Sequence, residues 1–284
     1  MKRLFLLFGF LGAFAVAASA QGRLEHLTIK SEVLGVEKPY SIYLPEGYDT
    51  SDERYPVLYL LHGAYSNHFS WNRNGGGELP RVADEEIAAG RIQKMIVVMP
   101  DASGVDGKKG GKNMGYFNVE GWPYETFFFD EFIPYIDKTF KTIATKECRA
   151  IAGLSMGGGG SVVYAQRHPD MFNACYSTSG LLDHYHRIKK PTVTLEWLWS
   201  VAETSPVAFL QKASAEELEK LRTVRWMADC GDDDHLIDVN IRFFGEMLRV
   251  GVPIEFRVRD GVHNWAFWRA SLPEILSFSF KKQQ

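Results

Sequence analysis

The stretch RAIAGLSMGGGG, residues 149–160, places one serine, Ser155, between an apolar run and a series of glycines. The residues before the serine are typical of a buried strand, and the pattern SVVYAQRHP that follows, residues 161–169, is typical of a helix. The pentapeptide GLSMG, residues 153–157, therefore matches the pattern G-x-S-x-G between a strand and a helix. Glycines two positions before and after the serine remove Cβ atoms that would collide in a sharp turn. We predict that Ser155 is a catalytic nucleophile.

Other uses of glycine fit this stretch less well. GLSMGGGG has no lysine where a phosphate-binding G-x-x-x-x-G-K-[ST] loop requires one. The segment GVDGKKGGKNMG, residues 104–115, does not fit that spacing either, and we expect it to be an exposed loop at the rim of the site. A tight turn without a catalytic role, with close helix packing at Gly158–Gly160, is the simpler alternative for the serine.

A serine hydroxyl is a weak nucleophile and needs a base, which an acid must orient. After a serine in a strand–turn–helix context the chain order is acid and then histidine. Of the eight histidines, His263 follows the last strand-like run, 254–261, in the sequence GVHNWAFW, and Gly261 permits a tight loop there. Catalytic groups of α/β proteins gather at the carboxyl ends of strands. We predict that His263 is the base; the alternative is a loop histidine with a structural partner.

Four aspartates compete for the role of the acid, in the sequence ADCGDDDHL, residues 228–236. Asp229 lies within the predicted strand, and Asp232, Asp233 and Asp234 lie on the turn that opens the next helix. Aspartates at such a turn commonly cap the helix, and a calcium loop would need a wider alternation of oxygen ligands. The spacing alone does not choose among the last three.

Strand-like and helical segments alternate along the chain from about residue 24. The pair 24–33 and 38–45 alternates in hydrophobicity and predicts antiparallel strands. Buried strands are predicted at 56–63, 94–101, 149–155, 174–180, 224–231 and 254–261, and helices at 124–140, 235–251 and 265–280, with a kink at Pro134. This order predicts an α/β fold in which a mostly parallel central sheet carries helices on both faces.

An insertion of about forty residues, 181–222, interrupts this alternation. It contains two helix starts, Ser205 before Pro206 and Ser214 with Glu217 in the spacing of a capping box. The insertion is too long for a simple crossover, so we predict a helical lid over the strand ends. The alternative is that it packs on the scaffold and leaves the cleft open. Residues 21–284 are predicted to form one domain.

The first twenty residues have the layout of a secretory signal peptide. A charged start precedes the apolar run 4–17, and Ala18-Ser19-Ala20 offers a cleavage site. A membrane anchor is the alternative, but the run is shorter than the roughly 20 residues that a bilayer span needs. We expect cleavage near Ala20, a secreted or periplasmic protein, and no stable membrane anchor.

The composition excludes several classes of protein. The chain of 284 residues has a formal net charge of -3 and a pI near 6.3, which argues against a nucleic-acid partner. His184 and His186 lack a third ligand at a suitable spacing, so we expect no metal site. The three cysteines, Cys148, Cys175 and Cys230, lie in or beside apolar runs and are expected to be buried free thiols. No organic cofactor is expected.

Five motifs in order, LLHGAYSNHFSW, YETFFFDEFIPYID, GLSMGG, CGDDDHL and GVHNWAFW, resemble the putative-esterase family of α/β-hydrolases over roughly residues 25–280. That family includes feruloyl and acetylxylan esterases, S-formylglutathione hydrolases, siderophore esterases and mycolyltransferases. The resemblance implies an α/β-hydrolase fold. It places the family's serine on Ser155, the acid of its C-G-x-x-D-x-L pattern on Asp234, and the histidine of its G-H-x-W pattern on His263.

The resemblance also implies an oxyanion hole made of two backbone N–H groups. One belongs to Met156, after the serine, and the other to Ala64, after the His-Gly pair that ends the third strand. Each such donor is typically worth roughly 3–4 kcal/mol in the transition state. The chain departs from the family at one position, because Val262 stands where the histidine loop usually has a second glycine.

These residues predict a serine ester hydrolase without a cofactor. The resemblance, together with the predicted export, implies removal of feruloyl or acetyl groups from plant polysaccharide. Tryptophans expected near the cleft are Trp71, Trp122, Trp197, Trp199 and Trp265; substrate contact is predicted for Trp71, Trp122 and Trp265, with core or lid packing as the alternative. Three other functions stay open: an acyltransferase of the mycolyltransferase type, a general short-chain carboxylesterase, and a catalytically silent carbohydrate-binding protein. The oligomeric state is not predicted.

Overall fold

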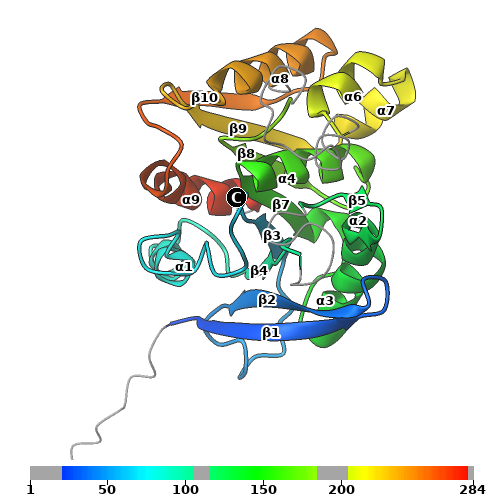
Figure 1. Ribbon diagram of the computed structural model, residues 1–284. Coiled ribbons are helices and arrows are strands. Elements are labelled where there is room, and N and C mark those ends of the chain that lie inside the picture. Colours follow the sequence, from blue (N-terminus) through cyan, green and yellow to red (C-terminus); the bar gives the residue numbers. More distant parts are fainter. Residues whose placement is uncertain (1–20, 105–114, 184–203, 281–284) are drawn as a thin grey trace, which may run out of the picture.

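An eight-stranded sheet forms the centre of the molecule (Figure 1). The structure, a computed structural model, describes residues 21–104, 115–183 and 204–280. The predicted signal peptide, most of the predicted rim loop, and the segment with His184, His186, Trp197 and Trp199 lie outside the described residues.

The strand order confirms the mostly parallel sheet. Along the sheet the order is β1-β2-β4-β3-β7-β8-β9-β10, with β1–β2 and β2–β4 antiparallel and all other neighbours parallel. The strands are β1 (Arg23–Ser31), β2 (Val36–Leu44), β3 (Val57–Leu61), β4 (Ile96–Pro100), β7 (Arg149–Leu154), β8 (Ala174–Thr178), β9 (Arg225–Gly231) and β10 (Glu255–Arg259). A separate small hairpin joins β5 (Asn118–Val119) to β6 (Trp122–Pro123). Every predicted strand is present.

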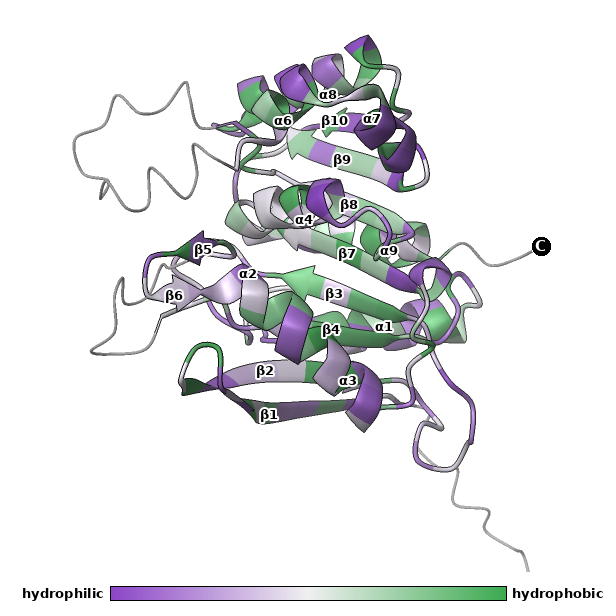
Figure 2. Cartoon of the chain, turned by 90° about the vertical axis from the view of Figure 1, so that its right-hand side faces the viewer, coloured by the Kyte–Doolittle hydropathy of each residue, from purple (hydrophilic) through white to green (hydrophobic). Residues whose placement is uncertain are grey.

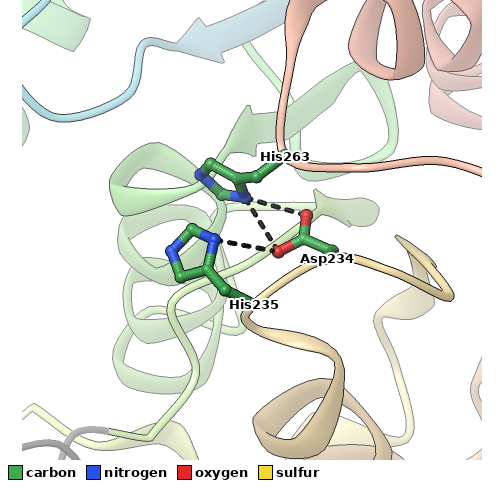
Figure 3. Close-up of side chains that lie close together, drawn as sticks. All are labelled: Asp234, His235 and His263. Carbon is green, nitrogen blue, oxygen red and sulfur yellow. Dashed lines mark hydrogen bonds and ion pairs between the residues drawn. The ribbon is translucent and has the colours of Figure 1, made fainter.

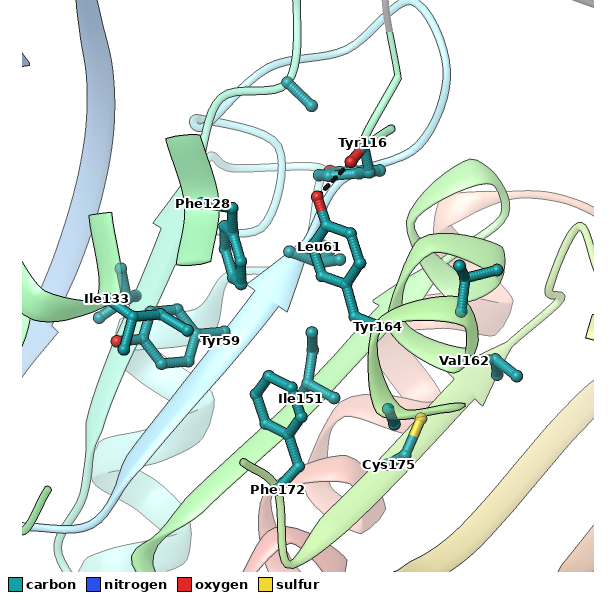
Figure 4. Packing of buried hydrophobic residues seen from close by; sticks show 14 of the residues in the cluster. Tyr59, Leu61, Tyr116, Phe128, Ile133, Ile151, Val162, Tyr164, Phe172 and Cys175 are labelled. Atoms are coloured by element: carbon teal, nitrogen blue, oxygen red, sulfur yellow. Dashed lines mark hydrogen bonds between the residues drawn. The ribbon is translucent and has the colours of Figure 1, made fainter. Parts of the chain in front are cut away.

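Helices cover both faces of the sheet (Figure 1). Successive strand residues point to opposite faces, so the core divides into two clusters. Leu58 and Leu60 of β3 pack with α1 (Leu79–Ala88) and α9 (Trp265–Ser279). Tyr59 and Leu61 belong to the other cluster, to which α3 (Ile133–Thr139), α4 (Met156–Arg167) and α8 (Ile237–Arg249) contribute residues, and Figure 4 shows part of it. The central strands β3, β4 and β7 are buried at every residue. The edge strand β1 instead alternates in burial and hydropathy (Figure 2).

The predicted helix at 124–140 is irregular near Pro134. It consists of α2 (Tyr124–Thr126), a π-helical segment (Phe127–Phe132) and α3. Pro134 lies in the first turn of α3 and has no N–H to donate to the preceding turn. The disturbance expected from the proline therefore takes the form of a π-helical segment just before it.

The described end of the insertion packs on the scaffold. Both predicted helix starts are present: Ser205 caps α6 (Pro206–Lys212) and Ser214 forms a capping box with Glu217 at α7 (Ala215–Leu221). α6 contacts α4 and α8, and the Gln166 side chain donates to the Pro206 carbonyl at 3.1 Å. The lid itself stays a prediction, because residues 184–203 lie outside the described part. Among the described residues, none of the helices has the length and apolar character to cross a membrane.

Candidate active site

Ser155 occupies a strained turn between β7 and α4, which we call the elbow (residues 153–157). Its φ of 53° lies in the left-handed region that non-glycine residues rarely adopt. Two backbone hydrogen bonds stabilise this conformation of Ser155. Its N–H donates to the Thr178 carbonyl at 3.0 Å, and its carbonyl accepts from the Leu181 N–H at 2.9 Å. A Cβ at Gly153 would lie 2.4 Å from the Gly157 carbonyl oxygen. The glycines of the elbow are therefore required by close backbone approach.

The structure brings Ser155, His263 and Asp234 together in one hydrogen-bonded chain. The Nε2 atom of His263 lies 3.0 Å from the Ser155 hydroxyl, and its Nδ1 atom lies 2.8 Å and 3.0 Å from the two oxygens of Asp234 (Figure 3 shows the latter pair). The carboxylate accepts only, so Nδ1 carries the ring proton and Nε2 is left to accept from the serine. The three residues follow β7, β9 and β10, whose carboxyl ends lie at one edge of the sheet.

Tertiary contacts distinguish Asp234 from its neighbours. Asp234 is buried and accepts from the Leu236 N–H at 2.8 Å. Burial raises the pKa of its carboxyl, but hydrogen bonds from His263 and the Leu236 N–H outweigh it and hold the pKa below the usual range. The carboxylate is therefore charged at neutral pH, as the orienting acid must be.

The other aspartates have different surroundings. Asp232 and Asp233 are exposed, and Asp232 accepts from the Gly261 N–H at 3.0 Å, which links the acid loop to the histidine loop. Asp229 is buried within β9 and accepts from Ser271 at 2.8 Å and from Arg259. None of these three contacts His263 within the described structure.

The histidine loop accommodates its departure from the family pattern. Gly261 has a φ of 152°, and a Cβ at Gly231 would lie 2.2 Å from its carbonyl oxygen. Val262, in the place of the second glycine, is 44% exposed. Because its side chain is partly exposed to solvent, the valine does not prevent the close contact between the acid loop and the histidine loop.

His235 was not singled out by its sequence pattern and lies at the site. Its Nδ1 atom is 3.5 Å from Asp234 Oδ1, and its ring centroid is 4.3 Å from that of His263 (Figure 3). Ligand atoms of these three residues lie within 4.8 Å of one another, a grouping that metal sites also use. Asp234 and His263 already bond to each other, and His263 to Ser155, so this arrangement is suited to proton transfer.

A cavity of about 450 Å³ opens at Ser155. This volume lies within the usual range of small-molecule sites. Besides the serine and His263, its lining includes Ala64, Tyr65, Arg73, His235, Trp265 and Trp268. Of the described residues of the insertion, none lines this cavity.

The tryptophans divide into core and cavity residues. Trp71 is buried, and its indole N–H donates to the Leu61 carbonyl at 3.0 Å. Trp122 is fully buried, beside Lys38. Neither lines the cavity, so their burial does not support substrate contact, and the alternative of core packing fits both. Trp265 does line it, as does Trp268, which the sequence analysis missed; its ring meets that of His263 edge-on at 4.9 Å.

The two expected oxyanion donors flank the serine. Met156 is the first residue of α4, where backbone N–H groups have no partner within the helix. Ala64 lines the cavity, and a Cβ on the preceding Gly63 would lie 3.5 Å from the Ser155 Cβ. The arrangement suits the stabilisation of negative charge beside the serine oxygen.

The open, mostly parallel sheet with a serine at a strand-to-helix turn, followed by acid and histidine loops, is the α/β-hydrolase fold. The pattern of the family described as putative esterase matches residues 31–279, so the chain belongs to that family.

Individual relatives agree with this assignment. An endo-1,4-beta-xylanase/feruloyl esterase of Xylanibacter ruminicola is 40% identical over 92% of this chain, which spans 32% of that protein's length. A solved ferulic acid esterase is 41% identical, with a TM-score of 0.85 over 92% of this chain and 98% of the other. A fluorophosphonate-binding serine hydrolase of Staphylococcus aureus, 23% identical, shares the fold with a TM-score of 0.75 over 92% of this chain and 100% of its own.

Proposed function

We propose that this protein hydrolyses carboxylic esters through an acyl-enzyme intermediate on Ser155. The observation that carries the proposal is the hydrogen-bonded chain from Ser155 through His263 to Asp234, at the wall of a cavity. Membership of the putative-esterase family supports the same reaction.

The geometry suggests the order of proton transfers. His263 Nε2 takes the proton of the Ser155 hydroxyl while the serine oxygen attacks the ester carbonyl. The N–H groups of Ala64 and Met156 hold the oxygen as it becomes negative. His263 then gives its proton to the departing alcohol oxygen. A water molecule, deprotonated by the same histidine, releases the acid and restores the serine.

Feruloyl or acetyl groups on plant polysaccharide are the proposed substrates. Two relatives, 40% and 41% identical to this chain, are named as feruloyl or ferulic acid esterases, and the name of the first also includes xylanase. The cavity has room for a small acyl group, and Trp265 and Trp268 offer apolar faces to an aryl ring or a sugar. Polymeric plant material lies outside cells, which is consistent with the export proposed from residues 1–20.

One substrate panel tests this proposal. Wild type and Ser155→Ala are assayed with methyl ferulate, acetylated xylan, short and long 4-nitrophenyl esters and a triglyceride emulsion. We expect activity on ferulate or acetylxylan, little on the emulsion, and none with Ser155→Ala. Ser155→Ala activity within tenfold of wild type would disprove the nucleophile. Activity on short 4-nitrophenyl esters alone would leave a general carboxylesterase, and ester products with an added alcohol would indicate an acyltransferase.

A further inference from the structure

A buried ion pair outside the cavity lining has no part in the proton transfers. Lys38 of β2 and Asp101, just after β4, have side chains that are 2% and 5% exposed, with 3.7 Å between Nζ and Oδ1. The Lys38 ammonium also donates to the Ser103 carbonyl at 2.6 Å. Burial lowers the pKa of the Lys38 ammonium, and Asp101 opposes that shift. Burying two charges is unfavourable unless their geometry is well satisfied, so this pair calls for a structural reason.

The ion pair fixes the backbone turn that follows β4. Asp101 Oδ1 accepts from the Ser103 N–H at 2.7 Å and from the Ser103 hydroxyl. The Asp101 carbonyl accepts from the Tyr124 hydroxyl at 2.8 Å. With the residues on both sides held, the N–H of the buried Ala102 between them points at the His62 ring, 2.9 Å from Nε2.

This contact determines the tautomer of His62. A backbone N–H can only donate, so Nε2 of His62 accepts and carries no proton. Burial lowers the pKa of His62, which keeps the ring neutral. The single ring proton of neutral His62 is therefore on Nδ1, which lies 2.8 Å from the carbonyl oxygen of Gly63 and donates to it.

The hold on the Gly63 carbonyl determines where the Ala64 N–H points. The C=O of Gly63 and the N–H of Ala64 belong to one planar peptide, and the described chain has no cis peptide bonds. In a trans peptide these two groups point in opposite directions. With the carbonyl bound to the His62 ring, the Ala64 N–H is directed away from that ring, and Ala64 lines the cavity beside Ser155.

We propose that His62 is a positioning residue for the oxyanion hole: the Ala102 N–H, placed by the buried Lys38–Asp101 pair, fixes the tautomer of His62, and the resulting Nδ1–H orients the Ala64 N–H through the Gly63 peptide. An asparagine at position 62 has a fixed N–H donor, so it needs no contact with Ala102 for this role. The proposal rests on the proposed function, because it takes Ala64 as an oxyanion donor. His62 touches no reacting atom and acts only by preventing rotation of one peptide.

Two substitutions separate the two contacts of His62. In His62→Asn the amide nitrogen lies near the position of Nδ1 and still donates to Gly63, whereas the contact with Ala102 is lost. In His62→Gln the amide oxygen reaches toward the position of Nε2 and accepts from Ala102, whereas no donor faces Gly63. Both variants keep a polar amide in a buried place, so a general loss of stability affects them alike.

The readouts are kcat and KM for a short 4-nitrophenyl ester, together with the inhibition constant of a trifluoromethyl ketone. The ketone carbon bonds to Ser155 Oγ, the serine proton passes to His263, and the carbonyl electron pair becomes an oxyanion in the hole. For His62→Gln we expect kcat to fall and the inhibition constant to rise by about tenfold to a hundredfold, less than the loss of an entire donor. KM should stay within about threefold. For His62→Asn we expect all three constants within about threefold of wild type.

Trp226→Phe is the control for a merely structural effect. The Trp226 indole donates to the Leu221 carbonyl at 2.8 Å and is buried, and Trp226 is not among the residues that line the cavity. We expect a lower melting temperature with kcat and the ketone's inhibition constant unchanged. The proposal is overturned if His62→Gln leaves the ketone's inhibition constant unchanged, or if His62→Asn weakens it as much or more. Loss of activity in Ser155→Ala together with such a result would leave the proposed function intact.

Discussion

Two turns meet at the candidate active site and are held in different ways. The elbow (residues 153–157) takes its shape from its own glycines and from backbone bonds to the neighbouring strand β8 and its loop. The His-Gly turn, residues 62–64, is held by groups from distant parts of the chain, one a backbone N–H and one a side-chain hydroxyl. The Ala102 N–H that bonds to the His62 ring is 40 residues away, and the Tyr116 hydroxyl that bonds to the His62 carbonyl at 2.9 Å is 54 residues away.

This difference explains why the elbow could be predicted from the sequence and the His-Gly turn could not. Steric exclusion at the elbow acts between residues a few positions apart, so a pentapeptide records it. The His-Gly turn depends on buried polar groups whose partners are known only after folding. Four substitutions test this contrast, from the largest expected effect to the smallest.

Asp234→Asn tests the one acid that tertiary contacts select from its neighbours. Because an amide would favour the wrong tautomer of His263, we expect kcat to fall by about 10⁴-fold with the fold intact. Asp232→Asn and Asp233→Asn are exposed controls and should change kcat only slightly. Steady-state kinetics with a short 4-nitrophenyl ester check this. If Asp233→Asn lowered kcat more than Asp234→Asn, the assignment of the acid to Asp234 would be wrong.

Asp101→Asn tests the remote support of the His-Gly turn. It leaves the Lys38 ammonium buried without its counter-charge, so we expect the free energy of unfolding to drop by about 3–5 kcal/mol. Adding Lys38→Met should restore part of the loss, because the unpaired charge is removed. The exposed pair Lys30–Glu32 provides the control: Glu32→Gln should leave urea unfolding nearly unchanged. Equal effects of Asp101→Asn and Glu32→Gln would contradict the role of burial.

His68 packs on Phe69 just beyond the His-Gly turn. Its surroundings lead us to expect that the free energy of unfolding falls in acid. Burial, with smaller contributions from His26, His62 and Lys38 and against that of Asp101, lowers the pKa of His68 from 6.5 to about 4. Between pH 6.5 and pH 4, His68 therefore binds a proton in the unfolded chain but not in the native state. The stabilising contribution is present above pH 6.5 and is lost as the pH falls toward 4, by about 3 kcal/mol in total.

Urea unfolding at pH 7 and pH 4.5 measures this loss. We expect His68→Asn to be less stable than wild type at pH 7, because the smaller amide loses the packing of the imidazole ring on Phe69, but to lose less stability on acidification. An identical pH dependence in the two proteins would rule out His68 as its source.

Gly157→Ala tests where the two turns touch. A Cβ at Gly157 would lie 2.5 Å from the carbonyl oxygen of His62, so we expect a loss of about 1–3 kcal/mol in stability with a clear fall in kcat. Gly245 of α8 has no atom within 4 Å of such a Cβ, and Gly245→Ala should instead stabilise the protein by about 0.5–1 kcal/mol. Thermal unfolding and kinetics on both variants check this; a harmless Gly157→Ala would mean that the turns are not in close contact.

The sequence by itself determined the alternation of strands and helices, the elbow around Ser155 and the caps at Ser205 and Ser214. These features depend on periodicity, steric exclusion and hydrogen bonds within a few residues. The family resemblance narrowed the acid to Asp234, a choice that spacing had left open, and the structure places that residue against His263.

Only the tertiary structure decided which polar and aromatic residues face the cavity. Trp71 and Trp122 have the same side chain as Trp265 and Trp268, yet the first two are in the core and the last two line the cavity. Lys38 and Asp101 are 63 positions apart in the sequence, and nothing local to either indicates that they form a buried pair. Such contacts arise when strands β2, β3 and β4 come together in the sheet, because burial and the choice of partner are properties of the packed chain.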